Sequence, residues 1–283
     1  MKLTLRDPAK CEQFVTTFMN IKIWSETLNI TIDNNRLYAQ GMDPSHVALF
    51  EISLWNNWFD IYEVEDGCSH HIGISLPILN KLLKTWKSGY SIELKYTEND
   101  SSMEIFFDGP YAKAFQMSLM DIDMELLQIP PTEHPLEMAM PSDNWKELMD
   151  NMVMFGDTVS ILCNEDHMKF RVKEEGQLCS MKTTIESKDF YHFDFDANHD
   201  DIRISYALGY LQKVCSFHKL SPYIYVHLNP EVPIQLSYIF DTDHENDKTN
   251  GIRFYIAPKQ IEEEDDEEDD DEDMEDAMEE LDM

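Results

Sequence analysis

An internal repeat constrains this chain more than any other feature, because its second half restates the pattern of the first at an offset of about 130 residues. Each half opens with an amphipathic helix, predicted over 8–22 and 143–154, and continues into short alternating strands joined by turns rich in Asn and Asp. A second helix follows in each half, over 77–87 and 207–217, before two closing strands. This pattern predicts an α+β protein of two similar domains, unless two unrelated α+β domains resemble each other by chance.

Two of these helices carry clear local signals. Asp7 is placed to cap the first helix, and Pro8 suits its first turn. In the helix over 77–87, helical spacing predicts one apolar side and an opposite basic side. The first helix has its apolar face at Phe14, Phe18 and Ile21, and the helix over 77–87 has its apolar side at Ile78, Leu79, Leu82, Leu83 and Trp86.

Between the halves, residues 119–136 contain three prolines and four acidic residues, which favours an extended connector. Its apolar members predict that it lies against the body of the protein; they are Ile122, Leu126, Leu127 and Ile129. The predicted organisation is an N-terminal domain at 1–118, the connector at 119–136, a C-terminal domain at 137–261 and a disordered acidic tail at 262–283.

Charge is distributed unevenly along the chain. The formal net charge is −34, and residues 262–283 hold 17 Asp or Glu and no Lys or Arg. The rest of the chain has 39 acidic residues against 22 basic ones, so it carries about −17. Bulk charge therefore disfavours a nucleic-acid partner, and any DNA contact has to come from a local basic surface.

The sequence lacks the common signatures of metal binding, catalysis and membrane insertion. The five cysteines are scattered without a CxxC pair, which favours reduced thiols. The run Cys68-Ser69-His70-His71 lacks the spacing of metal ligands, so we expect no metal and no cofactor. We also expect no enzyme activity, because there is neither a phosphate-binding glycine loop nor a recognisable nucleophile-and-base constellation. With no leader and no apolar run of membrane-span length, a soluble intracellular protein is expected.

Several short motifs follow one another along the chain. Residues 40–49 read Gln-Gly-Met-Asp-Pro-Ser-His-Val-Ala-Leu, and residues 119–123 and 129–130 read Leu-Met-Asp-Ile-Asp and Ile-Pro. Met-Pro-Ser at 140–142, Gly-Asp at 156–157 and Phe-Tyr-Ile-Ala-Pro-Lys at 254–259 complete the set. Together these motifs resemble the proliferating cell nuclear antigen family, from about residue 3 to residue 261.

The resemblance implies a ring-shaped homotrimer in which each chain supplies two similar clamp domains, with antiparallel sheets outside and four helices lining a central hole. It implies a DNA sliding clamp, a processivity factor that encircles duplex DNA independently of sequence and tethers DNA polymerase and other replication and repair proteins. The clamp loader and further proteins with clamp-binding peptide motifs are expected partners. The expected location is the nucleus or another site of DNA replication, including a viral one.

Eight lysines on or near the four predicted helices are expected to face DNA by this resemblance. Those of the helix over 77–87 have no acidic neighbours on their face, although an ordinary solvated face would show the same pattern. In contrast, Lys146 lies beside Glu147 and Asp150, where family members tend to be basic. The eight are Lys10, Lys22, Lys81, Lys84, Lys87, Lys146, Lys213 and Lys219.

The resemblance also implies a pocket for the peptide motifs of partner proteins. Methionine and aliphatic side chains provide an adaptable apolar hollow, which aromatic and aliphatic anchors of a partner can fill. His46 is expected to be part of the pocket wall, and several of the others would also serve as ordinary core residues. The pocket residues are Met42, His46, Val47, Leu49, Leu127, Ile129, Pro233, Tyr255, Ala257 and Pro258.

Ring closure implies a head-to-tail contact between subunits. By resemblance, residues 111–118 of one subunit pair edge to edge with residues 177–185 of the next, which would cover two strand edges. Ordinary exposed edge strands would have the same sequence pattern. The expected interface side chains are Tyr111, Phe115, Met117, Leu178, Met181 and Ile185.

The acidic tail admits a second hypothesis from another functional class. An acidic histone-chaperone-like protein would use such a tail to bind basic proteins, although the repeat and the pocket motifs oppose this interpretation. In a clamp, the tail is expected to tune access to the ring by repelling bare DNA and attracting basic segments of partners. A tail that only aids solubility is the simpler alternative.

Overall fold

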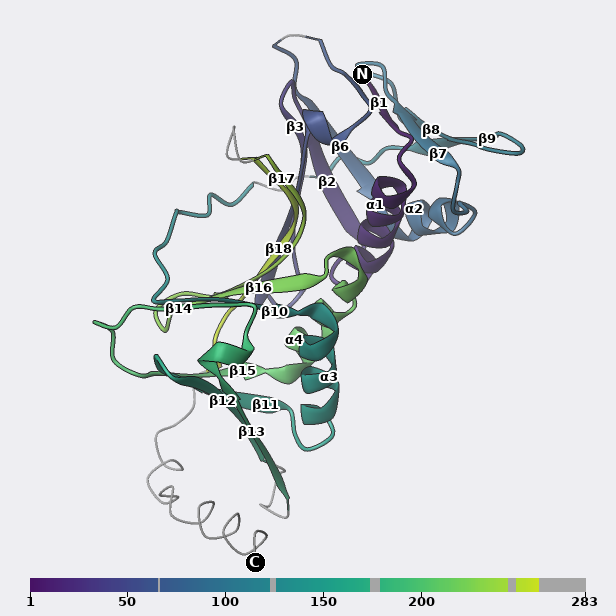
Figure 1. The fold of residues 1–283 in the computed structure, drawn as a ribbon. Helices are drawn as coiled ribbons and strands as arrows, with labels where there is room; N and C mark the ends of the chain where they lie inside the picture. Colours follow the sequence, from purple (N-terminus) through teal and green to yellow (C-terminus); the bar gives the residue numbers. More distant parts are fainter. Residues whose placement is uncertain (66, 123–125, 174–178, 244–247, 260–283) are drawn as a thin grey trace, which may run out of the picture.

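The fold repeats one order of elements in both halves of the chain. Our computed structural model describes residues 1–65, 67–122, 126–173, 179–243 and 248–259, so the predicted tail lies outside the described residues. Within these ranges, each half runs strand, helix, five strands, helix and three strands (Figure 1). The repeat in the sequence therefore corresponds to a repeat of structure.

The first half contains two helices and nine strands in its described residues. They are β1 (Lys2–Leu5), α1 (Pro8–Asn20), β2 (Thr27–Ile32), β3 (Arg36–Met42), β4 (Ala48–Trp55), β5 (Ile61–Glu63), β6 (His70–Ser75), α2 (Leu76–Leu83), β7 (Ser91–Lys95), β8 (Ser102–Asp108) and β9 (Lys113–Ser118).

The second half has the same set in the same order. It consists of β10 (Leu136–Pro141), α3 (Ser142–Met152), β11 (Thr158–Cys163), β12 (His167–Lys173), β13 (Ser180–Glu186), β14 (His192–Phe195), β15 (Ile202–Ala207), α4 (Leu208–Cys215), β16 (Tyr223–Leu228), β17 (Ile234–Asp243) and β18 (Lys248–Ile256).

The described strands form three antiparallel sheets. One sheet has the order β5-β1-β7-β8-β9 and belongs to the first half, and another has the order β13-β12-β11-β15 and belongs to the second. The third sheet spans both halves in the order β14-β10-β16-β17-β18-β4-β3-β2-β6. Its joint is the pairing of β18 with β4, from Gly251 opposite Ser53 to Ile256 opposite Ala48.

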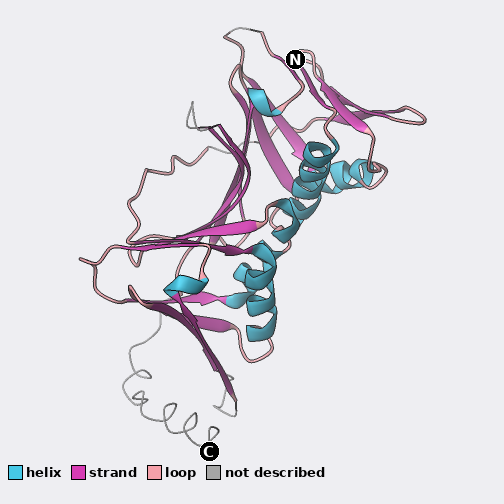
Figure 2. Ribbon diagram, in the orientation of Figure 1, coloured by secondary structure: helices cyan, strands magenta, loops and turns pink. Residues whose placement is uncertain are grey.

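The helices and the sheets lie on different sides of the molecule. The helices α1, α2, α3 and α4 lie along one side of an elongated subunit, and the sheets lie on the other (Figure 2). Hydrogen bonds also join the halves on the helical side. The Gln13 amide donates to the Leu220 carbonyl at 3.2 Å, and the Asn20 amide donates to the Ser216 carbonyl at 2.6 Å.

Local sequence signals account for the start of α1. The Asp7 carboxylate accepts hydrogen bonds from the backbone N–H groups of Ala9 and Lys10 at 2.8 and 3.1 Å, and Pro8 occupies the first turn. The predicted cap is therefore confirmed. The predicted apolar face is confirmed as well, since its three members are at most 4% exposed; they are Phe14, Phe18 and Ile21.

The second helix differs from the prediction in both its length and its buried face. It ends at Leu83, so Lys84 caps it and Lys87 lies in the following turn, which Gly89 closes with a φ of 87°. Ile78 is 43% exposed instead of buried. Asn80, which was not predicted to be buried, is 7% exposed, and its amide donates to the Phe18 and Met19 carbonyls at 3.4 and 3.2 Å.

The connector follows the body of the protein through polar contacts more than through burial of its leucines. Leu126 and Leu127 are 42% and 50% exposed, contrary to the prediction, whereas Ile122 and Ile129 are half-buried. Backbone carbonyls hold the segment instead: Asn29 donates to Ile122 at 3.1 Å and Asn229 donates to Glu133 at 2.9 Å. The strand β9 ends where the predicted connector begins, and β10 starts at its last residue, Leu136.

No helix in the described part of the chain is long and apolar enough to cross a membrane.

We predict that Gly251→Ala destabilises the pairing of β18 with β17, beside the joint, by about 1–3 kcal/mol, because a Cβ there would lie 2.4 Å from the Tyr238 carbonyl oxygen of β17. Gly209→Ala in α4 is the matched control, since a Cβ at that position meets nothing within 4 Å. Both changes affect the unfolded chain alike, so the control should be neutral or stabilising by up to about 1 kcal/mol. Urea unfolding of both variants measures the difference, and equal stabilities would contradict this account of the close contact between β17 and β18.

Candidate partner-binding site and DNA-facing surface

Three strands bring the centre of the predicted pocket together on the outer face of the nine-stranded sheet. Met42 at the end of β3 lies opposite Leu49 on β4, and Leu49 lies opposite Tyr255 on β18. These side chains are half-buried, whereas the adjacent Phe50 and Phe254 are fully buried on the core face. Neighbouring strands lie about 4.8 Å apart, so the side chains of Met42, Leu49 and Tyr255 form one continuous apolar strip, which we call the outer strip.

The loop between β3 and β4 forms the next part of the pocket, and Asp43 fixes its shape. The Asp43 carboxylate is buried and accepts hydrogen bonds from the backbone N–H groups of Ser45, Val47 and Ala48 at 3.0, 2.8 and 2.7 Å. Tyr210 of α4 donates its hydroxyl to the same carboxylate at 2.9 Å. A residue of the second half therefore helps to position a loop of the first.

The same hydrogen bonds keep Asp43 ionised. Burial alone would raise the pKa of this carboxyl group, but the N–H groups of Ala48 and Ser45, the Tyr210 hydroxyl and the N–H of Val47 together hold the pKa below its usual value. The group is therefore an acceptor for all four donors at neutral pH.

Other predicted pocket residues gather around this loop. His46 is exposed and has a φ of 58°, in the left-handed region. The Val47 carbonyl accepts a hydrogen bond from the Ala257 N–H at 3.0 Å, which ties the loop to the end of β18. Pro233 and Pro258 adjoin the same end of the β17–β18 pair, because Ile234 lies opposite Ile256.

The connector is attached to this surface by one buried side chain. Gln40, which is 2% exposed, donates its amide N–H to the Leu127 carbonyl at 3.0 Å and accepts from the Leu127 N–H at 2.7 Å. The Leu127 side chain stays exposed beside the outer strip, and Ile129 lies two residues further along. The contacts in the structure do not place the Ile129 side chain against the strip, so its role in the pocket stays a prediction.

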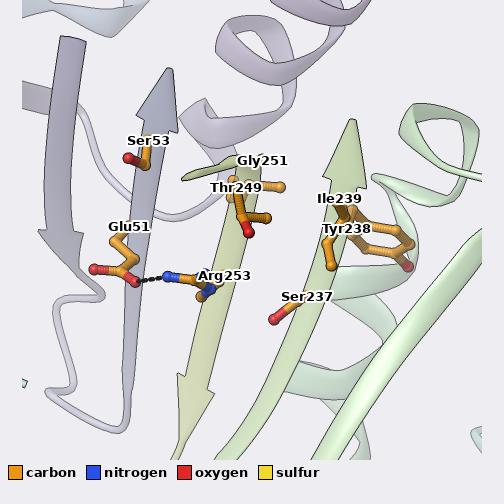
Figure 3. Close-up of a pocket in the computed structure, with 9 residues that line it drawn as sticks. Glu51, Ser53, Ser237, Tyr238, Ile239, Thr249, Gly251 and Arg253 are labelled. Atoms are coloured by element: carbon orange, nitrogen blue, oxygen red, sulfur yellow. Dashed lines mark hydrogen bonds and ion pairs between the residues drawn. The ribbon is translucent and has the colours of Figure 1, made fainter. Parts of the chain in front are cut away.

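A half-buried acid, Glu51, joins the connector to the outer strip through a hydrogen-bond network. Glu51 on β4 accepts from the hydroxyls of Tyr38 and Tyr255 at 3.0 and 3.1 Å, and it forms an ion pair with Arg253 at 3.1 Å (Figure 3). The Gln40 amide also donates to the Tyr38 hydroxyl at 3.2 Å. Burial and the Glu51 carboxylate raise the pKa of both tyrosines, so both remain hydrogen-bond donors at neutral pH.

The predicted DNA-facing lysines differ in whether other groups of the chain engage their ammonium groups. Those of the α2 region, Lys81, Lys84 and Lys87, are exposed, and no ion pair within the described residues engages them. Lys22 and Lys219 are also exposed, on short 3-10 turns beside α1 and α4. These five ammonium groups are therefore available to phosphates.

The remaining three lysines are engaged within the subunit. Lys146 forms an ion pair with Asp150 one helical turn away. Lys10 donates to the Trp58 carbonyl at 2.9 Å, and the Lys213 ammonium lies 4.8 Å from the centre of the Tyr210 ring. Contacts of this kind reduce the charge that these lysines can offer to DNA.

The predicted interface residues that the structure describes lie on or beside β9 and β13. Tyr111 is 58% exposed, and Phe115, Met181 and Ile185 are partly buried. Met117 is 1% exposed and belongs to the core of its own half, so this placement does not support a side-chain contact with a neighbouring subunit. Leu178 lies outside the described residues.

Within the described residues, no group of three or more His, Cys, Asp or Glu side chains is placed to hold a metal ion.

Sequence reasoning missed the polar residues that organise the pocket. Asp43 before Pro44 carries a turn signal that would have indicated its capping role. Nothing in the sequence pointed to Glu51 or Tyr210, because their partners lie as far as 204 and 167 residues away.

Comparison with protein-family models gives two adjoining matches. Residues 13–128 match the model described as the N-terminal domain of proliferating cell nuclear antigen. Residues 128–259 match the model for the C-terminal domain of the same protein.

We predict that Tyr210→Phe loosens the pocket loop. Removing one hydrogen bond to a buried carboxylate should cost about 1.5–3 kcal/mol of stability and accelerate hydrogen exchange at the Val47 and Ala48 amides. The Asp43 pKa is depressed in the folded state, so its contribution is present at neutral pH and is lost as the pH falls through that pKa. The variant should raise this pKa and move the loss to a higher pH.

Tyr191→Phe serves as the control, because Tyr191 is 63% exposed and stacks on Tyr223 without engaging Asp43. Equal amide exchange in the two variants would show that Tyr210 does not hold the loop.

Proposed function

Because this chain belongs to the proliferating cell nuclear antigen family, we propose that three copies of it close into a ring around duplex DNA and tether DNA polymerase there. The family is one of DNA sliding clamps, which hold proteins on DNA and catalyse no reaction. The two antiparallel-sheet domains and the helices on one side fit a clamp fold. In this proposal the chain is a processivity factor and not an enzyme.

The proposal rests on two edge strands whose counterparts in the repeat pair with each other. By position in the repeat, β9 corresponds to β18 and β13 corresponds to β4. The strands β18 and β4 pair with each other within the chain, whereas β9 and β13 each end a sheet. The other sheet ends are edges in both halves: β5 corresponds to β14, and β6 corresponds to β15. Among the strands that the structure describes, β9 and β13 are therefore the two edges that we expect to pair with another copy.

Pairing β9 of one copy with β13 of the next would repeat the internal joint between copies. Such a contact is head-to-tail, and it must either close into a ring or grow into a filament. These two strands lie at opposite ends of the subunit (Figure 1), as a closing chain of copies requires. The family resemblance supports three copies, which would give six similar domains around one hole.

Encirclement explains how so acidic a chain can retain DNA. In the ring the helical side faces the hole, where Lys22, Lys81, Lys84, Lys87 and Lys219 would meet phosphates. Phosphate contacts are independent of base sequence, which allows sliding. A closed ring needs little affinity, because escape requires the ring to open.

The outer strip, the loop of Asp43 and the connector together form the proposed docking site for partner peptides. A partner would cover the half-buried Met42, Leu49 and Tyr255 with aromatic or aliphatic anchors, while the Gln40 clamp holds the connector beside it. DNA polymerase, the clamp loader and other replication and repair proteins are the proposed partners. The proposed location is the nucleus or a viral site of DNA replication. No observation on the fold favours the histone-chaperone hypothesis.

We predict that the α2 lysines contribute most of the phosphate contacts. Changing Lys81, Lys84 and Lys87 to alanine should lower the slope of log affinity for DNA against log salt by about three units for each copy in the ring that contacts the duplex, roughly one for each phosphate contact. Lys146→Ala is the matched control and should change the slope little, because Asp150 already neutralises that charge. Salt titrations of DNA binding measure both slopes, and equal changes would contradict the ranking.

Processive synthesis on a primed circular template tests the function itself. The wild-type chain, loaded by its clamp loader, should increase the length of DNA that a polymerase makes in each binding event. Replacing Ile129 and Tyr255 with alanine should abolish this stimulation, since truncating a central anchor costs about 2 kcal/mol or more. Neither residue lies on β9 or β13, so the ring should survive in the variant. Full stimulation by a folded variant would refute the docking site.

A further inference from the structure

The chain leaves its two halves at equivalent places. Where the connector begins, the Met120 N–H donates to the Gly73 carbonyl of β6 at 2.8 Å. Just before the acidic tail, the Lys259 N–H donates to the Ser205 carbonyl of β15, also at 2.8 Å. Because β6 and β15 correspond in the repeat, the tail follows an exit from the second half that matches the start of the connector in the first.

The strands beside these two exits also match in register. In the first half, one row across the sheet consists of Gly73, Asn29, Gln40 and Glu51, on β6, β2, β3 and β4. The matching row in the second half consists of Ser205, Ser160, Arg171 and Lys182, on β15, β11, β12 and β13. The connector crosses the first row, since Asn29 donates to the Ile122 carbonyl and Gln40 binds the Leu127 backbone. A segment on the same path in the second half would pass over Arg171 and Lys182.

The outer face of this second-half sheet is basic, although the chain has 56 acidic residues against 22 basic ones. The helix α3 covers the other face, where Trp145 contacts the Phe170 ring (Figure 1). Within the described part of the chain, Glu186 is the only acidic residue at an outward position of these four strands. Four basic side chains at outward positions are exposed or half-buried; they are Lys169, Arg171, Lys182 and Arg203.

The arrangement of these basic residues favours an anionic cover. Arg171 and Lys182 lie directly opposite each other on neighbouring strands, and like charges in such a pair destabilise a sheet. Lys169 and Arg203 occupy the next row, on either side of β11. An acidic segment laid across this face would offset the repulsion and gain several ion pairs at once.

The acidic segment tethered closest to this face is the tail of the same chain. Leu127 lies seven residues after Met120, and seven residues after Lys259 the sequence reaches Asp266. Ile261 takes the position of Ile122, and residues 262–266 read Glu-Glu-Glu-Asp-Asp. Seven extended residues span up to about 24 Å, whereas β15 and β13 are three strand spacings, about 14 Å, apart. So short a tether gives a millimolar effective concentration, so weak ion pairs suffice to hold the acids there.

We propose that residues 261–266 dock on the outer face of the β13-β12-β11-β15 sheet, along the path that the connector takes over the first half. The contact is made within one chain and does not depend on ring closure. Docking covers the basic outer face, so the phosphates of DNA are left to the lysines of the helical side.

Carbodiimide cross-linking of the full chain, read by mass spectrometry, tests this docking. The reagent joins an amine to a carboxylate in contact with it, so Lys169 and Lys182 should be linked to residues 262–266. The lysines of the α2 region should form no such link. In 1 M salt, where the screening length is about 3 Å, the cross-links should decrease at least tenfold. Arg171→Gln keeps both amines and should lower the yield at Lys182 at least threefold.

The melting temperature separates docking from a general effect of tail charge. Changing the acids at 262–266 to glutamine and asparagine should lower it by about 2–4 °C at low salt, because the tail then no longer screens the repulsion between Arg171 and Lys182. The matched control changes the five acids at 269–273 in the same way. It should melt at the same or a higher temperature, since it only reduces the self-repulsion of the chain. With Arg171→Gln and Lys182→Gln present, the two tail variants should melt alike.

Three outcomes would overturn the docking. The first is equal melting of the two tail variants when Arg171 and Lys182 are intact. The second is cross-linking of the tail to the α2 lysines, which would place it on the helical side. The third is protection of Lys169 and Lys182 from acetylation by duplex DNA without any tail cross-link there, which would assign the basic face to nucleic acid.

Discussion

The backbone pairing of β4 with β18 is the interaction on which the rest of this structure depends. It turns two similar halves into one subunit with a continuous nine-stranded sheet, and the Trp55 N–H adds a hydrogen bond to the Asn250 side chain at 2.7 Å. The outer strip and the Glu51 network both lie across this joint. The candidate binding surface therefore exists only because the two halves share one sheet, and its polar framework links strands from both.

The charge of the chain is the second constraint. A body of about −17 cannot bind DNA as a generally basic protein does, and Lys146, Lys10 and Lys213 are occupied by contacts within the subunit. A closed ring removes the need for high affinity, since topology and not binding energy keeps the DNA in place. In the proposed ring, the few free lysines on the helical side would supply the local positive charge that attracts phosphates.

Much of the fold could be predicted from the sequence, because the signals were local. The repeat, the Asp7 cap and the alternating strands depend on neighbouring residues, and the structure has them. The errors arose where a distant partner decides the outcome: Asn80 is buried because the carbonyls of α1 accept its amide, while Ile78 is exposed. Leu126 and Leu127 are exposed because hydrogen bonds hold the connector. In the candidate site the apolar strip was predictable by resemblance, whereas Glu51 and Tyr210 were not, because their roles depend on residues of the other half.

The central claim is that the internal joint is repeated between chains until a ring of three closes. Light scattering coupled to size-exclusion chromatography at moderate salt tests it most directly, since it gives the molar mass independently of shape. The account predicts about 100 kDa, three times the 33.2 kDa of one chain, at every loading concentration above that of ring dissociation. A mass of about 33 kDa at all concentrations, or a mass that grows without limit as in a filament, would contradict it.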